Sequence, residues 1–299
     1  MKVGLQISSF TWPGGPENIG PTLARIAGDA DTAGFDSIWV MDHFFQIRGV
    51  GHPEEPMLEG WTTLGFLAAH TRSARLGLMV GGVHYRQPAL WIKAATTLDV
   101  LSGGRAWLGI GAAWNEDESR SLGFPFPSLG ERFDLLEDTL AMAHAMWTGD
   151  SGTGAPFDGH ATHATRILNS PQSLSRPRVP IMIGGGGEKK TLRLVAQYGD
   201  ACNVFGTPEA IARKYAILAD HCAAVGRDPD EIERSTLQTV NVSLEGSRGS
   251  ETPAQIIDRF GQLSDAGAQH VIFNVPDVND PGRIELLARD VLPALRDLS

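Results

Sequence analysis

A carboxylate and an imidazole directly follow an apolar run near the N-terminus. Residues 37–41 read Ser-Ile-Trp-Val-Met, typical of a buried strand, and Asp42 and His43 come next. Histidine changes its protonation state near neutral pH, so it can exchange a proton with a substrate. We therefore take His43 as the candidate catalytic residue and expect Phe44 and Phe45 to wall its pocket. The alternative is that Asp42 caps a loop and His43 only packs.

Four consecutive glycines follow one expected strand and open an expected helix: Gly184, Gly185, Gly186 and Gly187. Glycine lets a loop turn tightly and approach a ligand without a side chain in the way. The free N–H groups of such a loop, with the positive end of the next helix, favour an anion such as phosphate. The alternative is an ordinary flexible connection. The run is not a Walker A loop, because Lys189 stands where that motif requires glycine.

Two further segments place glycine after an expected strand. In MVGGVHYRQP (79–88), the paired glycines indicate unusual backbone geometry near a ligand. In GIGAAWNEDE (109–118), small residues leave room for a flat ring, and Asn115 can supply orienting hydrogen bonds. Trp114 replaces the third glycine of a dinucleotide fingerprint, so that interpretation is weak. The histidines of HATH (160–163) have no further ligand pattern nearby, so no metal site is predicted.

Short apolar runs alternate with longer segments of helical periodicity along the chain. One helix is expected to end at Gly34, and another to begin with Thr207 as N-cap and Pro208 in its first turn. Strands are expected over 2–8, 35–41, 74–83, 105–111, 179–184, 200–206, 234–244 and 268–275, and helices over 19–34, 61–71, 88–102, 129–147, 188–199, 207–226, 252–267 and 281–298.

This alternation predicts parallel strands covered by helices, and eight repeats fit a (β/α)8 TIM barrel. A doubly wound open sheet is the rival, but no phosphate-binding fingerprint follows the first strand. Residues 148–178 are rich in Gly, Ser, Thr and Pro and are expected to form an insertion before strand five. We expect a single domain over 1–299. Asp42 and His43 would then stand at the catalytic rim, where strand carboxyl ends meet.

The bulk composition narrows the class of partner. Twenty-five Lys and Arg against 35 Asp and Glu give a net charge of −10, which argues against nucleic acid or an anionic membrane surface. With two cysteines, the sequence has no disulfide framework, and this fits a reducing, cytoplasmic compartment. No apolar run is long enough to span a membrane. A small-molecule substrate is the expected partner.

Five segments in order resemble the bacterial luciferase-like superfamily, and more closely its oxidoreductases that use the deazaflavin coenzyme F420. They are AGFDSIWVMDHFF, LGLMVGGVHYRQP, TLDVLSGGRAWLGIGAAWNEDE, LGERFDLLEDTL and PIMIGGGGEKKTLRLVAQYGDACN. The resemblance covers essentially the whole chain and implies a TIM barrel with an excursion before strand five. Many members of the family form homodimers, although the residues here show no interface.

The resemblance also implies roles for single residues. Asp42 and His43 match the pair that meets the deazaflavin ring, with the histidine near the carbon that carries the hydride. Gly82 and Val83 match a bulge, often with a non-prolyl cis peptide, that backs the ring. The remaining matches are with the loop beside the ring, at Gly111 and Asn115, and with the phosphate cradle, at Gly184, Gly185, Gly186, Gly187 and Thr191.

Two positions depart from the family pattern. Sugar-phosphate dehydrogenases of this branch carry a catalytic glutamate where this chain has Ala112, and Gln87 replaces the His or Asn of many relatives. The prediction is hydride transfer between F420 and an unidentified organic substrate. An FMN-dependent monooxygenase on the same fold and a paralogue that binds without turnover remain as alternatives.

Overall fold

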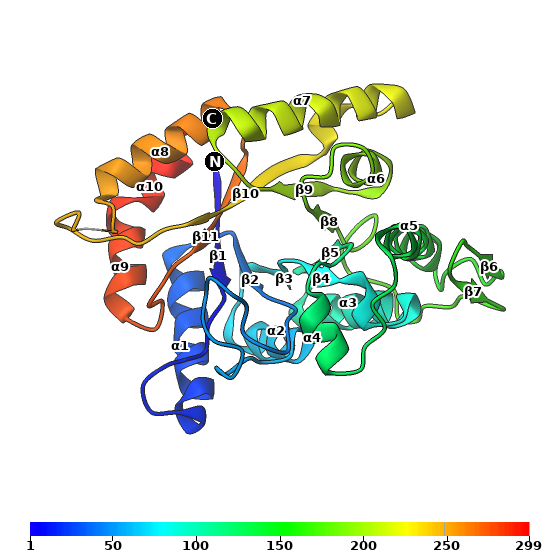
Figure 1. Ribbon diagram of the computed structural model, residues 1–299, viewed down its shortest axis with the longest axis horizontal. Helices are drawn as coiled ribbons and strands as arrows, with labels where there is room; N and C mark the ends of the chain where they lie inside the picture. Colours follow the sequence, from blue (N-terminus) through cyan, green and yellow to red (C-terminus); the bar gives the residue numbers. More distant parts are fainter. Residues whose placement is uncertain (248, 299) are drawn as a thin grey trace.

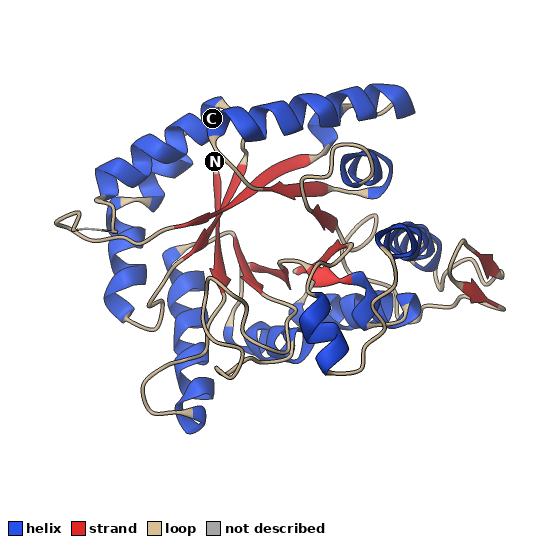
Figure 2. Cartoon of the chain, viewed as in Figure 1, coloured by secondary structure: helices blue, strands red, loops and turns tan. Residues whose placement is uncertain are grey.

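Parallel strands form a closed ring in the computed structural model, which describes residues 1–247 and 249–298 (Figure 1). Strand β3 also pairs with β5, which closes the ring, and helices cover its outside (Figure 2). This confirms the predicted TIM barrel. In ring order the strands are β3 (Arg75–Leu78), β2 (Ser37–Val40), β1 (Lys2–Ile7), β11 (His270–Asn274), β10 (Glu233–Thr239), β9 (Ala201–Val204), β8 (Ile181–Gly184), β5 (Ala106–Gly111) and β4 (Gly81–Gly82).

The helices lie close to the expected ranges, with four main differences. The first begins at Pro16 rather than residue 19, and the helix expected from residue 188 begins at Thr191. The last is divided at Val291, and a short helix at 116–121 was not expected. The helices are α1 (Pro16–Ala33), α2 (Gly60–His70), α3 (Pro88–Ser102), α4 (Glu116–Ser121), α5 (Leu129–Met146), α6 (Thr191–Tyr198), α7 (Pro208–Val225), α8 (Pro253–Asp265), α9 (Pro281–Asp290) and α10 (Leu292–Arg296), with 3-10 turns η1 (Val83–Tyr85) and η2 (Pro229–Glu231).

Helix ends follow the local chemistry of the sequence. Thr207 accepts a hydrogen bond from the backbone N–H of Ala210 and caps α7, as predicted. Ser128 and Glu131 form a reciprocal capping box at the start of α5. Gly34 ends α1 with φ 85°, a conformation that glycine adopts without steric cost. These caps fix where each helix begins or ends relative to the barrel.

Two tryptophans fill the barrel interior, and glycines make room for them. Trp39 and Trp107 pack edge to face with ring centroids 6.3 Å apart. A Cβ atom on Gly77 would lie 2.5 Å from the Trp39 ring, and one on Gly109 would lie 1.8 Å from the Leu78 carbonyl oxygen. Gly77 therefore leaves room for the Trp39 ring, and Gly109 allows β5 to approach the backbone of β3 closely.

The expected strand over 74–83 is interrupted. Strand β3 ends at Leu78 and β4 begins at Gly81, and the peptide between Met79 and Val80 is cis. Strand β10 ends at Thr239, five residues earlier than expected. Both differences lie at carboxyl ends of strands, where the chain leaves the ring and turns toward the barrel mouth.

Two buried carboxylates hold the segment 148–178 against the barrel. Asp138 of α5 accepts backbone hydrogen bonds from His160, Ala161 and Thr162 at 2.6–2.9 Å. Asp99 of α3 accepts bonds from the backbone of Leu174 and Ser175. The turn that Asp138 holds belongs to a small hairpin, β6 (Phe157–Asp158) with β7 (His163–Ala164), which projects beyond α5 (Figure 1). The segment is thus an insertion between α5 and β8.

Within residues 1–247 and 249–298, no helix is both long enough and apolar enough to cross a membrane.

Substituting Gly109 should destabilise the barrel. In Gly109→Ala the new methyl would meet a backbone oxygen that cannot rotate away, so we expect a loss of about 2–3 kcal/mol in unfolding free energy. Chemical denaturation measures it. The matched control is Gly28→Ala in α1, where a Cβ meets nothing within 4 Å, and a gain of about 0.5–1 kcal/mol is expected. Equal stability of both variants would contradict this account of the barrel packing.

Candidate active site

A cavity of about 600 Å³ opens at the carboxyl ends of the strands. Of the predicted site residues, Gly186 and Val83 are not part of its lining. The predicted residues that do line it are Asp42, His43, Gly82, Gly111, Asn115, Gly184, Gly185, Gly187 and Thr191. The barrel therefore gathers residues from β2, β4, β5 and β8 around one space, as expected for this end of a parallel barrel.

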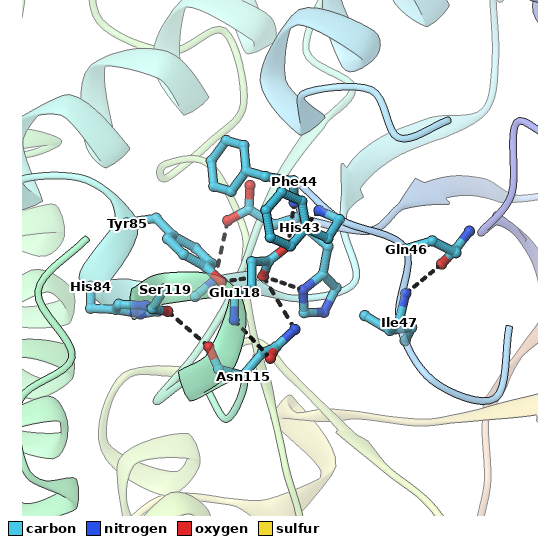
Figure 3. A network of polar contacts seen from close by, with 12 residues as sticks. His43, Phe44, Gln46, Ile47, His84, Tyr85, Asn115, Glu118 and Ser119 are labelled. Atoms are coloured by element: carbon cyan, nitrogen blue, oxygen red, sulfur yellow. Dashed lines mark hydrogen bonds and ion pairs between the residues drawn. The ribbon is translucent and has the colours of Figure 1, made fainter. Parts of the chain in front are cut away.

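A buried glutamate that the sequence analysis did not single out holds His43. Glu118, on the first turn of α4, is 1% exposed, and its carboxylate lies 2.8 Å from His43 Nδ1 (Figure 3). It also accepts hydrogen bonds from the Tyr85 hydroxyl and from the backbone N–H groups of Phe44 and Phe45. Five donors reach this one carboxylate when the Asn115 amide at 3.4 Å is included.

These hydrogen bonds determine the ionisation of Glu118 and the tautomer of His43. Burial raises the pKa of Glu118, but the bonds from His43, Tyr85 and Phe45 outweigh it and leave the pKa below its ordinary value. An ionised carboxylate only accepts hydrogen bonds, so His43 Nδ1 carries a proton. The other ring nitrogen, Nε2, has no partner in the described part of the chain. His43 lines the cavity, so this nitrogen is the one available to a ligand.

The two phenylalanines after His43 do not wall the cavity, contrary to expectation. Phe44 stacks on Phe124 at 5.1 Å between centroids and contacts Tyr85 edge to face. Neither Phe44 nor Phe45 lines the cavity, because the chain turns there to present both N–H groups to Glu118. Their contribution to the site is through the backbone. Trp114 takes the expected position instead, packing edge to face on His43 at 5.5 Å.

Asp42 links two loops of the rim. Its oxygens lie 2.8 Å from both terminal nitrogens of Arg86, and the Gly82 N–H donates to it at 3.1 Å. Burial raises the pKa of Asp42, and the paired Arg86 opposes that rise. Arg86 also contacts Glu59 and lies 4.6 Å over the Trp91 ring. Asp42 thus ties the end of β2 to β4. Gln87, the next residue after Arg86, is exposed at the start of α3.

Val80 occupies the position that was expected for Val83. The cis peptide precedes Val80, whereas Val83 begins η1 and is fully buried in the outer core. Val80 lines the cavity, and Cβ atoms on Gly184 and Gly111 would lie 2.6 and 3.1 Å from its side chain. The break between β3 and β4 shifts the chain, so the wall residue lies three positions earlier. Gly184 and Gly111 are glycines because Val80 packs against them.

The Asn115 side chain is already hydrogen-bonded, so it is less available to a ligand than expected. Its side-chain oxygen accepts a bond from the Glu118 N–H at 3.3 Å and caps α4. Its amide nitrogen contacts the Glu118 carboxylate. Asn115 lies on the cavity wall, but both ends of its side chain hold Glu118 in place.

The glycine loop leaves polar groups without partners just before α6. Gly185 adopts φ 120°, and among the described residues the N–H groups of Gly186 and Gly187 have no acceptor. A Cβ on Gly187 would lie 2.7 Å from Thr191 Oγ1, the hydroxyl of the first residue of α6. That hydroxyl likewise has no partner in the described chain. Lys189 and Lys190 are exposed beside the loop, whereas Arg193 is paired with Glu137 at 2.8 Å.

Side-chain amides stand at the barrel end of the cavity. Gln6, Asn203 and Asn274 come from β1, β9 and β11. Asn203 Nδ2 donates to Ser235 at 2.9 Å, but its buried Oδ1 has no partner. An unpaired buried oxygen is costly unless a ligand supplies a donor. In residues 1–247 and 249–298, no group of three or more His, Cys, Asp and Glu could hold a metal ion.

A model of the luciferase-like monooxygenase family matches residues 1–248. The chain belongs to that family. Two of its relatives are an uncharacterised protein of Mycobacterium tuberculosis, 27% identical over 86% of this chain and 88% of its own, and an F420-dependent glucose-6-phosphate dehydrogenase of Nocardia farcinica, 27% identical over 95% and 96%.

Solved structures of this luciferase-like fold include two with a TM-score of 0.82. One is an F420-dependent secondary alcohol dehydrogenase with an F420-acetone adduct, 19% identical, covering 99% of both chains. The other is the monooxygenase RslO1 of Streptomyces bottropensis, 17% identical, covering 98% of this chain and 99% of its own. At this identity they show the fold alone.

A second histidine of the luciferase-like chain lies behind the site. His84 Nε2 is 2.7 Å from Ser119 Oγ, which itself donates to the Asn115 carbonyl. Ser119 therefore accepts from His84, and the buried Nδ1 of His84 is left without a partner. Burial, with the nearby charge of Arg132, lowers the pKa of His84 to about 4.

The stability of the protein should therefore fall in acid through His84. Between about pH 6.5 and 4 the unfolded chain binds a proton at this residue and the native chain does not, so stability rises with pH across that window. The stability that depends on neutral His84 is fully present above about pH 6.5, and it decreases no further below about pH 4. His84→Gln removes this titration, and we expect its stability to fall about 1–2 kcal/mol less than the parent between pH 7 and 4.5.

Denaturant titrations at several pH values measure the difference. Above pH 6.5 the two curves should run parallel, which serves as the internal control. Curves that stay parallel down to pH 4.5 would show that His84 is protonated in the native protein.

Proposed function

We propose that the chain is an oxidoreductase that binds coenzyme F420 and transfers a hydride between it and an organic substrate. The observation that carries this proposal is one cavity that joins the His43 imidazole, fixed by Glu118, with the open glycine loop before α6. The F420-dependent dehydrogenase among its sequence relatives supports the choice of cofactor.

The residues present fit such a cofactor. The unpaired N–H groups of Gly186 and Gly187 and the Thr191 hydroxyl are donors suited to a phosphate, and the φ 120° of Gly185 turns the backbone there. The unpaired Asn203 Oδ1 and the neighbouring amides can pair with the alternating N–H and C=O groups of a pyrimidine-type ring. Deazaflavin bound there would supply or accept the hydride.

The chain itself supplies orientation and a proton. Because Nδ1 of His43 donates to Glu118, its Nε2 is directed to the substrate side and can accept or donate a proton. Tyr85 and Glu118 bind each other, and Asp42 is occupied by Arg86. His43 is therefore the group assigned to proton exchange. Asp42 acts as a positioning residue for the rim.

The FMN-dependent monooxygenase is the second candidate. The family model is one of monooxygenases, and the monooxygenase RslO1 has the same TM-score as the F420-dependent alcohol dehydrogenase. Oxygen uptake separates the two, since reduced FMN reacts readily with oxygen and reduced deazaflavin scarcely does. A paralogue that binds without turnover is less well supported. A carboxylate that fixes the histidine tautomer toward an open cavity is a feature of proton-transfer sites.

The first test is cofactor preference. We expect purified protein to bind F420 more tightly than FMN, measured by fluorescence titration. Thr191→Val keeps the shape but removes one donor, so it should weaken F420 binding about tenfold. Thr97→Val, whose hydroxyl bonds the Lys93 carbonyl on the exposed face of α3, is the matched control and should bind normally. FMN binding at least ten times tighter than F420 would refute the cofactor assignment.

The second test concerns proton exchange. His43→Ala should lower turnover about 10²–10⁴-fold while cofactor affinity changes little, because positioned acid–base groups contribute in that range. Turnover is followed by cofactor oxidation with a substrate supplied by screening. His163→Ala, on the exposed β6–β7 hairpin, is the control and should behave as the parent.

Glu118→Gln separates positioning from packing. Glutamine has one acceptor oxygen and no charge, so it cannot serve both His43 Nδ1 and the N–H groups of Phe44 and Phe45. The pH profile of turnover should therefore shift, and turnover itself should fall. Near-normal turnover of His43→Ala, with only a lowered melting temperature, would reduce His43 to a packing residue.

A further inference from the structure

Four large apolar side chains are exposed around the mouth of the cavity. Their exposed fractions are 37% for Val50, 63% for Trp114, 56% for Leu129 and 58% for Phe205. They come from loops after β2, β5 and β9 and from the first turn of α5. Exposed apolar groups that gather at one opening, from separate parts of the chain, mark a binding surface rather than scattered surface residues.

The apolar character continues inward. Ile47, Met79, Val80, Phe133 and Leu237 line the same cavity. A molecule that passes from the mouth toward His43 therefore meets a mostly hydrocarbon wall. Such a wall favours apolar ligand surface by about 25 cal/mol per Å² removed from water.

The charges that line the cavity also favour an uncharged ligand. Among the described residues that line it there is no Lys or Arg, and its one carboxylate, Asp42, is paired with Arg86. Nearby Arg132 is also engaged, since it donates to the Ala112 and Pro127 carbonyls. Exposed lysines flank the glycine loop, which the proposed function gives to the cofactor. Away from that loop, a charged substrate would lose hydration without gaining a partner.

We propose that the substrate of this site is an uncharged, largely apolar organic molecule, and not a sugar phosphate or another anion. The proposal rests on the proposed function, which assigns the glycine loop to the cofactor and leaves the apolar mouth to the substrate. It sets this chain apart from the sugar-phosphate dehydrogenase among its relatives. Ala112, which brings no carboxylate to the wall, accords with that difference.

A homologous series of ketones tests the substrate class. Calorimetry measures the binding of 2-pentanone, 2-hexanone, 2-heptanone and 2-octanone, with glucose 6-phosphate as the anionic comparison. Each added methylene should lower the Kd about fourfold, the factor expected for a buried CH₂ group. With the cofactor bound, so that the glycine loop is filled, glucose 6-phosphate should bind at least about a hundredfold more weakly than 2-octanone. A flat ketone series, or glucose 6-phosphate bound as tightly as 2-octanone, would overturn the proposal.

A pair of variants tests whether the ketones bind at the mouth of the cavity. Phe205→Ser should raise the Kd of 2-octanone about tenfold by removing a ring from the mouth. Leu101→Ser is the matched control, because Leu101 is 75% exposed on α3 and does not line the cavity. Equal affinities in the two variants would show that the ketones bind elsewhere, which also overturns the proposal.

The cofactor proposal and the substrate-class proposal can be refuted separately. The ketone titrations are run on the protein alone and on the protein saturated with F420, or with FMN if that binds more tightly. Loss of F420 binding with an intact ketone series refutes the cofactor and leaves the substrate class standing. Tight F420 binding with a flat series in both forms refutes the substrate class alone.

Discussion

The active-site rim depends on one buried carboxylate. Glu118 is charged in a place almost without solvent, and such a charge is tolerated only when its lone pairs are all used. The donors come from the loop after β2, from η1 and from Asn115 before α4. Three segments far apart in the sequence must therefore adopt mutually consistent positions, and His43 is oriented as a consequence.

A second buried pair supports the same rim from the other side. Asp42 and Arg86 join the end of β2 to the start of α3, and the Gly82 N–H adds β4 to the link. Val80 then packs into the space that Gly111 and Gly184 leave open. The cavity wall is thus fixed by ion pairs and close backbone approach on rigid strand ends, whereas its mouth is formed by exposed apolar side chains.

The fold, and the gathering of most candidate residues around one cavity, could be predicted because they follow from periodicity. Apolar runs and helical spacing place His43, Gly82, Gly111 and the glycine loop at strand ends, and parallel strands bring these ends together. Glu118 could not be found this way. Its helix is short and polar, and its partner His43 lies 75 residues away, so neither pattern nor spacing relates them. The only signal was a run of acidic residues after Asn115.

Local errors had a different cause. Val83 was predicted for the wall position that Val80 occupies, because the break between β3 and β4 shifts the chain and periodicity does not reveal such a break. Phe44 and Phe45 were assigned to the pocket because of their side chains, but the carboxylate of Glu118 uses their backbone. A side-chain pattern says nothing about which N–H groups a distant acceptor will need.

The buried network also leaves His43, among several titratable groups at the site, with a ring nitrogen available to a ligand. Asp42 is held by Arg86, and the Tyr85 hydroxyl is directed at Glu118. Burial of the Tyr85 hydroxyl and its hydrogen bond with Glu118 raise the pKa of Tyr85. Glu118 has no lone pair left for a ligand. Among the described residues that line the cavity, this leaves His43 Nε2 as the atom to which the proposed function assigns proton exchange. An apolar wall around one available imidazole nitrogen suits the uncharged substrate that we propose.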